Sequence, residues 1–374
     1  MNADTVTVSA FLSGGNILMP LRYLPMQPHE HCWTFLQDAH RPIILYGTGD
    51  GADKVLDELE HLHIPIQGIM ASDDFVRGQT FRGFTVRRLS DLVQQYTNPV
   101  ILIAFGSQRP EVISHILDLA EKYTVLCADV PVYGTNIFNE AFFAQHQQEI
   151  EQAAVCWEDD VSRQVYDNII RFKLSGKLSY LTAVFSDKDE AFYQILCLHD
   201  HESYLDLGAY RGDTIDEFLH YTKGQYQQIT ALEPDRKNYR KLREYTASLE
   251  HIQTFRMGIW SKDTDLYFDG ALGRGSSIQT DGNRCIPVTT IDTLYRKRPL
   301  TYLKIDVEGA EEQALLGGRT VLERDKPKLN LALYHRSEDI FKLPLLLKEI
   351  NPSYRLYLRQ HPHIPAWDLN LYAR

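Results

Sequence analysis

The sequence predicts an α/β protein built on two open, mostly parallel sheets. Apolar strand, glycine turn and amphipathic helix follow one another twice, once from residue 42 to 61 and again from residue 204 to about 220. Short apolar strands alternate with helical stretches around both units, which is typical of parallel sheets. At 374 residues the chain exceeds one ordinary core, so we expect two domains.

The composition is that of a globular protein without a strong single-sign charge field. Hydrophobic residues make up 44% and the net charge of −11 is spread along the chain, so we expect neither a nucleic acid nor a membrane as partner. The first residues lack a signal-peptide pattern and no window approaches 18 uninterrupted apolar residues, which predicts a cytoplasmic protein. The five scattered cysteines fit neither a disulfide framework nor a zinc site.

The N-terminal part divides into an arm and a small domain. Residues 1–40 carry prolines without a sustained period and predict an irregular arm. Residues 41–133 predict a small α/β domain of about four strands, with strands at 42–46, near Met70, at 99–105 and at 124–128, and with helices at 50–61 and about 110–122.

The first glycine turn of this small domain matches a dinucleotide-binding pattern. Gly47, Gly49 and Ala52 satisfy Gly-x-Gly-x-x-Gly/Ala, and Asp73 or Asp74 follows the second strand. Such turns also occur without a ligand, so two interpretations stay open. The domain binds a nucleotide or nucleotide-sugar, or it has a structural or dimerising role.

Residues 134–185 predict a helical connector, because AFFAQHQQEIEQAAVC and VSRQVYDNIIRF both space their apolar residues as helices do. The adjacent carboxylates Asp159 and Asp160 point apart on a helix, so we interpret them as a solvated turn rather than a metal site. A further helix at 187–199 leads into the second unit.

The second glycine turn lies in the motif SYLDLGAYRGDT, residues 203–214. Gly208 and Gly212 suit a tight turn that lets a ligand approach the backbone. A second strand at 229–232 ends at Glu233, whose carboxylate can accept both hydroxyls of a ribose. The order Asp-x-Gly-Ala-x-x-Gly nevertheless differs from the dinucleotide fingerprint.

Later strands bring further polar residues to the same expected sheet edge. Asp306 and Glu308 follow a strand at 302–305, and His335 follows a strand at 328–333. Lys304 within the first of these strands requires a carboxylate partner. The glycine-rich stretch between 264 and 290 predicts an inserted hairpin that covers the substrate, with Ser276 and Ser277 in its loop.

Five motifs in order, LDLGAYRGDT, ALEPDRKN, GIWSKD, IPVTTIDTL and YLKIDVEGAEEQALLGG, resemble the FkbM family of S-adenosylmethionine-dependent methyltransferases. The resemblance covers residues 204–373. It implies a class I methyltransferase Rossmann-like fold over residues 186–374, with a mostly parallel seven-stranded sheet whose last two strands are antiparallel. Beside it we expect the N-terminal Rossmann-like domain.

The resemblance implies S-adenosylmethionine as cofactor and the hydroxyl of a small polar, sugar-like or polyketide-like molecule as acceptor. The residues expected to bind the cofactor are Asp206, Gly208, Ala209, Tyr210, Gly212, Asp213, Thr214, Glu233, Gly258, Ile259 and Asp306. Trp260 is expected beside the adenine or in the core. The candidate catalytic residues are His335, whose ordinary pKa of about 6.5 suits a base, and Asp306, which orients that base, takes the proton or contacts the substrate.

Three alternatives accompany this prediction. Asp306, Glu308 and His335 could together hold a divalent cation that activates the acceptor. A non-catalytic protein could bind a nucleotide or nucleotide-sugar in both halves. An NAD-dependent oxidoreductase could use the first glycine turn, but no Tyr-x-x-x-Lys pair follows it at a usable spacing.

Overall fold

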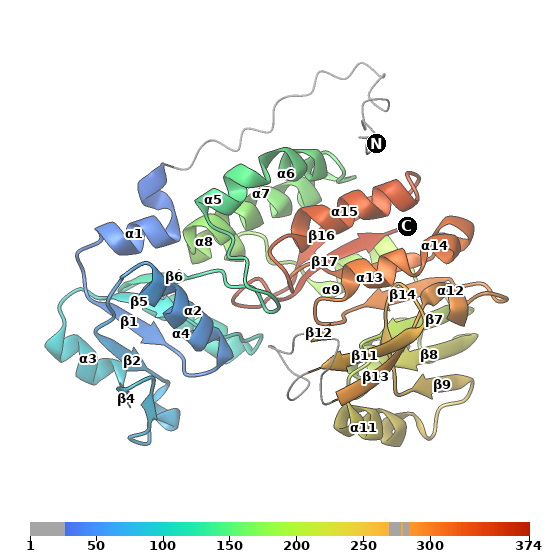
Figure 1. Ribbon diagram of the computed structural model, residues 1–374, viewed down its shortest axis with the longest axis horizontal. Coiled ribbons are helices and arrows are strands. Elements are labelled where there is room, and N and C mark those ends of the chain that lie inside the picture. Colours follow the sequence, from blue (N-terminus) through green and yellow to red (C-terminus); the bar gives the residue numbers. More distant parts are fainter. Residues whose placement is uncertain (1–26, 269–277, 280–283) are drawn as a thin grey trace, which may run out of the picture.

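The computed structural model describes residues 27–268, 278–279 and 284–374. Figure 1 shows two sheets side by side, with the N-terminal sheet in blue and the C-terminal sheet in yellow to red. Helices from the middle of the chain lie beside them together with a helix near the C-terminus. Among the described helices, none is long and apolar enough to span a membrane.

The N-terminal sheet has six strands in the order β3-β4-β2-β1-β5-β6. All neighbours are parallel except β3 and β4, which form a hairpin that the sequence did not predict. Arg82 and Gly83 make its two-residue turn, both at positive φ, as such hairpins require. The elements of this part are β1 (Ile43–Tyr46), α2 (Asp50–His61), β2 (Gly68–Met70), η2 (Asp73–Phe75), β3 (Thr80–Phe81), β4 (Phe84–Arg87), α3 (Leu89–Gln95), β5 (Val100–Ile103), α4 (Pro110–Ala120) and β6 (Thr124–Cys127).

The chain before this sheet is more regular than expected. A short 3₁₀ turn, η1 (Pro28–Glu30), leads into α1 (Cys32–Asp38), which buries Cys32, Trp33 and Leu36. The prediction of an irregular arm is therefore wrong for residues 28–38. These residues form a short helix because its apolar face packs against the rest of the protein. The earlier residues lie outside the described part.

The predicted helical connector consists of α5 (Glu140–Gln145), α6 (Gln147–Ala154), α7 (Asp160–Ser175) and α8 (Leu178–Thr182), followed by α9 (Lys188–Glu190) and one π-helical turn, η3 (Ala191–Leu196). Asp159 caps α7 by accepting from the backbone of Ser162 and pairs with the buried guanidinium of Arg359 at 2.8 Å. It is therefore not part of a solvated turn. Its role is structural, and it joins the connector to the C-terminal sheet.

The C-terminal sheet has seven strands in the order β16-β17-β15-β14-β7-β8-β9. The strands β7, β8, β9, β14 and β15 are parallel. The last two strands, β16 and β17, are antiparallel to each other as predicted; β17 is the reversed one, and β16 points the same way as the other five. The strands are β7 (Ser203–Leu207), β8 (Gln228–Leu232), β9 (Ile252–Phe255), β14 (Tyr302–Ile305), β15 (Lys328–Ala332), β16 (Leu356–Gln360) and β17 (Leu369–Ala373). The helices are α10 (Asp213–Tyr221), α11 (Arg236–Thr246), α12 (Ile291–Leu294), α13 (Glu311–Leu316), α14 (Arg319–Asp325) and α15 (Asp339–Ile350).

A small second sheet projects from this half in the order β10-β13-β11-β12. Its strands are β10 (Gly258–Ile259), β11 (Thr264–Phe268), β12 (Ile278–Gln279) and β13 (Arg284–Thr289). The antiparallel pairing of β11 with β13 confirms the predicted inserted hairpin. Ser276 and Ser277 lie outside the described residues.

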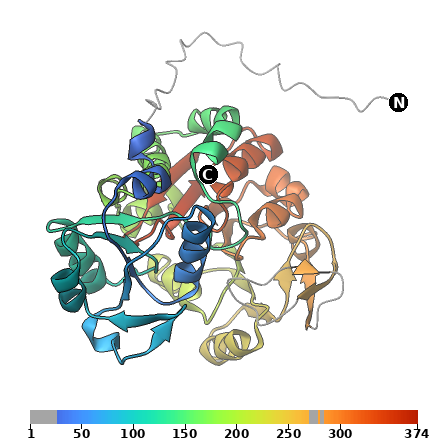
Figure 2. The same ribbon diagram turned by 60° about the vertical axis from the view of Figure 1, so that its left-hand side comes forward.

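One hydrophobic cluster joins the two sheets through the connector. It includes Ile101 and Ile103 of β5, Ile169 of α7, and Leu331 and Leu358 of the C-terminal sheet. Figure 2 shows the helices of the middle segment between the two sheets. The predicted division at residues 133 and 185 stays a prediction, because residues on both sides of each boundary share this core.

Candidate functional site

A cavity of about 430 Å³ opens at the carboxyl ends of the parallel strands of the C-terminal sheet. This is the edge at which open α/β sheets bind ligands. The cavity-lining residues that the sequence predicted are Gly208, Tyr210, Asp213, Thr214, Glu233, Gly258, Ile259, Trp260, Asp306 and Glu308.

Gly208 and Gly212 are needed for the packing of the chain itself, and the expected close approach of a ligand stays a prediction. Both have positive φ, +86° and +104°. A Cβ on Gly208 would collide with the carbonyl oxygen of Asp306, and one on Gly212 would collide with the ring of Tyr245. Gly208 thus lets β7 and β14 end close together, and Gly212 lets the start of α10 approach Tyr245 of α11.

Glu233 lies at the end of β8, and only 6% of its surface is exposed. Its two carboxylate oxygens accept backbone N–H groups of Tyr210 at 3.0 Å and of Asp235 at 2.8 Å. Burial outweighs these bonds and raises the pKa of Glu233 to about 7. Each oxygen keeps a lone pair for a further donor, so the side chain can accept the hydroxyls of a ribose.

Three of the predicted cofactor residues lie behind the cavity wall instead of lining it. Ala209 is buried, and Gly212 precedes the first turn of α10. Asp206 is fully buried and accepts the Thr214 hydroxyl at 2.5 Å. Burial raises the pKa of Asp206 to about 6 although Lys304 opposes this shift. Asp206 therefore holds the turn in place, and its predicted contact with a ligand is indirect.

Asp306 is the carboxylate at the bottom of the cavity, at the end of β14. Its Oδ2 accepts a hydrogen bond from the Lys304 ammonium at 3.1 Å, and its Oδ1 accepts one from the Tyr334 hydroxyl at 3.2 Å. The expected partner of Lys304 is therefore Asp306. Burial alone would raise the pKa of Asp306, but Lys304 and His335 outweigh burial and lower it. Asp306 is thus an anion that is fixed from behind and open to the cavity.

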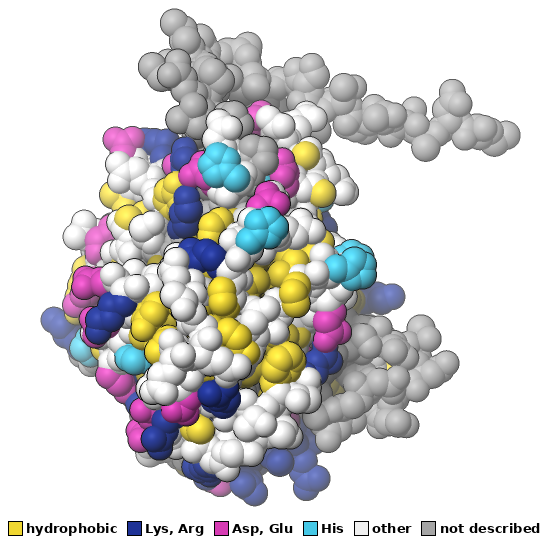
Figure 3. All heavy atoms as spheres, turned by 90° about the vertical axis from the view of Figure 1, so that its left-hand side faces the viewer, with side chains coloured by type: hydrophobic (Ala, Val, Ile, Leu, Met, Phe, Trp, Pro, Cys, Tyr) yellow, Lys and Arg dark blue, Asp and Glu magenta, His cyan; other side chains and the backbone are white. Residues whose placement is uncertain are grey.

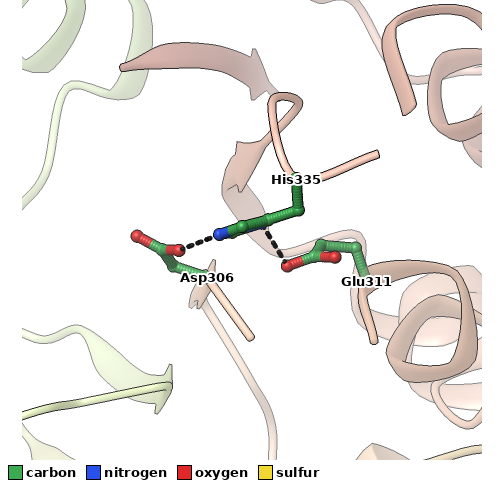
Figure 4. A group of neighbouring side chains, drawn as sticks. All are labelled: Asp306, Glu311 and His335. Atoms are coloured by element: carbon green, nitrogen blue, oxygen red, sulfur yellow. Dashed lines mark ion pairs between the residues drawn. The ribbon is translucent and has the colours of Figure 1, made fainter. Parts of the chain in front are cut away.

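His335 lies behind Asp306 and not in the cavity wall. Figure 4 shows its ring between two carboxylates: Nε2 faces Asp306 at 3.4 Å and Nδ1 faces Glu311 at 2.9 Å. Burial lowers the pKa of His335, but Glu311, Asp306 and Glu308 outweigh burial and raise it to about 10. The ring is therefore a cation at neutral pH and has no free lone pair. This state opposes the expected role of a neutral base.

The same arrangement bears on the cation alternative. Asp306, Glu311 and His335 offer ligand atoms within 4.8 Å of one another, with Glu311 taking the place expected for Glu308. The imidazole, however, lies between the two carboxylates and directs one ring nitrogen to each of them. A cation held by both carboxylates would have to displace a buried ring, so the geometry favours a charged hydrogen-bonded chain over a chelate.

Two residues that the sequence did not reveal complete the cavity wall. Tyr133 comes from the loop after β6, and Arg336 follows His335. The guanidinium of Arg336 lies 4.4 Å from the centre of the Tyr133 ring, and the Tyr133 backbone donates to the His335 carbonyl. Lys54 of α2 donates to the carbonyls of Pro131 and Val132, which fixes this loop. No sequence pattern could show a contact between residues 200 positions apart.

The N-terminal glycine turn touches the C-terminal half on one side only, because Gly49 is exposed and a Cβ there would meet no atom within 4 Å. Trp367 packs against Gly106 so closely that a Cβ there would lie 2.5 Å from its ring, and a Cβ on Gly51 would lie 3.9 Å from the same ring. Ser107 forms a β-bridge with Ile364. Asp73 and Asp74 are exposed in η2. This packing gives the neighbourhood of the first turn a structural role, and a nucleotide site at the turn stays a prediction.

The far end of the cavity is apolar where an adenine is expected. Met257, Gly258, Ile259 and Trp260 line it, and Leu266 and Ile286 of the hairpin face them. Asp263 is not a partner for a base there, because it accepts the hydroxyls of Thr289 and Thr293.

Comparison with known protein families matches the part of the chain that forms most of this cavity. Residues 206–367 match the model of the methyltransferase FkbM domain. These residues form an FkbM methyltransferase domain. The protein is accordingly an S-adenosylmethionine-dependent methyltransferase, and the enzyme and cofactor predictions are confirmed.

The fold extends beyond this domain in a solved relative. The crystal structure of methyltransferase FkbM from Methylobacillus flagellatus is 21% identical, with a TM-score of 0.69 over 89% of this chain and 90% of that one. This likeness shows that the fold of both halves recurs. Fibrillarin from Aeropyrum pernix, solved with S-adenosylmethionine, is 15% identical over 49% of this chain and 70% of its own, with a TM-score of only 0.32. No curated protein matches the chain.

Proposed function

We propose that the methyltransferase transfers the methyl group to a hydroxyl oxygen of a small polar acceptor, which Asp306 orients and deprotonates. The observation that carries this proposal is the fixed, cavity-facing carboxylate of Asp306 between Lys304, Tyr334 and His335. The bound sulfonium supplies the activated methyl group. The chain must hold the acceptor in line and receive one proton.

The cofactor fits the side of the cavity around Glu233. The carboxylate of Glu233 would accept the ribose hydroxyls, and the apolar strip from Met257 to Trp260 would contact the adenine. Placed so, the cofactor leaves the end with Asp306, Tyr133 and Arg336 for the acceptor.

Asp306 suits the proton transfer despite its lowered pKa. The hydroxyl proton becomes strongly acidic as the new O–CH₃ bond forms, so a weak base close by suffices to take it. Lys304 and the His335 cation hold the carboxylate in one position. In this proposal His335 positions Asp306, and Glu311 keeps the His335 cation in place.

The acceptor wall is a joint product of both halves. The Tyr133 ring offers a flat apolar face and Arg336 offers donors, a combination that suits the mixed faces of a sugar or polyketide-like molecule. The N-terminal sheet contributes by holding the Tyr133 loop, mainly through Lys54.

A methyl-transfer assay tests the atom that receives the methyl group. Purified enzyme with labelled cofactor is offered sugar and polyketide-like acceptors, each beside a derivative with its hydroxyls blocked and a derivative with an amine in their place. We expect label only on free hydroxyls, as an alkali-stable ether. Label on the amine derivatives alone would contradict an O-methyltransferase while leaving the methyltransferase assignment intact.

A further inference from the structure

We propose that an exposed basic groove along α11 binds an acceptor that carries several phosphate, sulfate or carboxylate groups along its length. This proposal rests on the proposed function and extends it, because it places the methylated hydroxyl on a longer molecule whose anionic groups lie in the groove. Figure 1 shows α11 beside β9 and β13, at the lower edge of the C-terminal half.

The groove consists of two adjoining hollows on the protein surface, of about 580 and 880 Å³. Six cationic side chains line them and only two carboxylates do so. The cations are Arg211, Arg236, Lys237, Arg240, Arg243 and Arg256, and the carboxylates are Asp235 and Glu244. Such a concentration of positive charge stands out on a chain whose net charge is −11.

Most of these cations are not neutralised by the protein. Glu244 pairs with Arg240 at 3.7 Å and with Lys241 at 3.0 Å. Asp235 accepts the backbone N–H groups at the start of α11. Within the described residues no ion pair is formed by Arg236, Lys237, Arg243 or Arg256. All four are exposed.

The spacing of the cations points to a ligand with several charges. Arg236, Arg240 and Arg243 follow one another at intervals of four and three residues, so they share one face of α11 and span about 10 Å along it. A single phosphate would meet only one or two of them. A row of this length fits a chain-like molecule with successive anionic groups.

The groove is continuous with the cofactor cavity. Pro234, Asp235, Asn238 and Ile286 line both spaces. Arg211 marks the passage, because it bonds Asn238 and lies 4.8 Å from the centre of the Tyr210 ring, a residue of the cavity wall. An acceptor held in the groove can therefore extend toward the cavity mouth.

The N-terminal face of the molecule carries charges of both signs (Figure 3). Figure 3 looks onto the N-terminal half, where acidic and basic side chains alternate with hydrophobic ones. The positive charge of the groove along α11 is therefore a local feature and is not shared by the N-terminal face.

Binding of labelled oligosaccharides to the full chain tests the proposal. The probes are a sulfated oligosaccharide, a neutral one of the same length and a single-stranded oligonucleotide of equal charge. They are compared by fluorescence anisotropy at about 50 and 200 mM NaCl, a range over which surface charges become screened. We expect the sulfated probe to bind, to weaken with salt and to compete with the oligonucleotide, and the neutral probe to bind at least tenfold less tightly.

The variant Arg236→Glu/Arg240→Glu/Arg243→Glu should weaken binding of the sulfated probe by about tenfold or more, because three attractive charges become repulsive. The matched control is Arg77→Glu/Lys122→Glu/Lys223→Glu, which makes the same charge change at exposed sites outside the groove. We expect less than a twofold effect there.

Calorimetry with S-adenosylmethionine separates the two proposals. Cofactor affinity should be unchanged in both triple variants. Equal weakening of the sulfated probe by the control variant, or no binding of that probe, would overturn the groove and leave the methyltransferase intact. Binding of the oligonucleotide that the sulfated probe does not displace would assign the groove to nucleic acid and overturn the stated class of acceptor.

Discussion

Both sheets carry a strand, a glycine turn and a helix at one edge, and the surroundings of the two turns differ. At the C-terminal edge the turn after β7 borders a space of about 430 Å³ next to Glu233 and Asp306. At the N-terminal edge the loop after β5 packs against Trp367 and is joined to the C-terminal half by the bridge between Ser107 and Ile364, and the helix after the first glycine turn reaches the same ring at Gly51. The same local motif therefore predicts the backbone but not whether its edge is free for a ligand.

The acidic residue at the next strand distinguishes the two edges. Glu233 is buried, with both oxygens held by backbone donors and its pKa raised to about 7. Asp73 and Asp74, at the equivalent place in the N-terminal sheet, are exposed in η2. A burial-shifted carboxylate at a strand end is a better sign of a functional site than the glycine spacing.

The largest expected effect concerns the open edge. Asp306→Asn keeps the size of the side chain but removes its charge, so kcat should fall by about 10²- to 10⁴-fold while the affinity for S-adenosylmethionine stays nearly unchanged. Glu308→Gln, an exposed carboxylate beside it, is the control and should cost less than tenfold.

The His335→Gln variant distinguishes a positioning role from a base. If His335 only positions Asp306, the decrease in kcat in His335→Gln should be smaller than in Asp306→Asn. The double variant should then be no slower than Asp306→Asn alone. A kcat that rises with pH toward about 10 in the wild type, and loses this rise in His335→Gln, would instead make His335 the base.

Much of this comparison could be predicted from the sequence. The strand and helix pattern was enough for α2, the resemblance to the FkbM family implied the mostly parallel C-terminal sheet, and strand ends placed Asp306 and His335 together. The charge state of His335 was not predictable, because it depends on Glu311, which reaches the ring from the start of α13. The contact of Trp367 with Gly106 and the contact of Tyr133 with Arg336 both depend on how the two halves pack. The periodicity of apolar residues within one segment carries no information about such packing.

Removing the contact between Trp367 and the N-terminal half should lower the stability of the protein and leave cofactor binding unchanged. Trp367→Ala removes the ring that packs on Gly106 and should lower the free energy of unfolding by about 2 to 4 kcal/mol. Denaturant unfolding measures this loss, with calorimetry as the check that S-adenosylmethionine still binds. Thermal stabilisation of the wild type by NAD or a nucleotide-sugar, lost in Gly51→Leu, would show that the first turn is a ligand site after all.

A smaller effect tests the cofactor side of the open edge. Glu233→Gln keeps one side-chain oxygen as a hydrogen-bond acceptor. It replaces the other oxygen by an NH₂ group, which cannot accept from the backbone N–H or from a ribose hydroxyl. We expect cofactor affinity to fall by about 1.5 to 3 kcal/mol, the usual cost of hydrogen bonds to a charged group. Asp213→Asn, also in the cavity wall, should weaken binding less. Equal losses in the two variants would remove the special role of Glu233.

The smallest expected effect follows from the pKa of Glu233, which burial raises to about 7 in the cofactor-free protein. The ionised carboxylate accepts both ribose hydroxyls, so binding favours the charged form and releases a proton wherever Glu233 was protonated. Affinity for S-adenosylmethionine should therefore weaken as pH falls from 8 to 6, by up to about tenfold, and level off above pH 8. Calorimetry in buffers of different ionisation enthalpy measures both the affinity and the proton released. Titration of the ligand itself persists in Glu233→Gln, so the difference between the two proteins reports Glu233 alone. An identical pH dependence in both would show that this carboxylate is already ionised before the cofactor arrives.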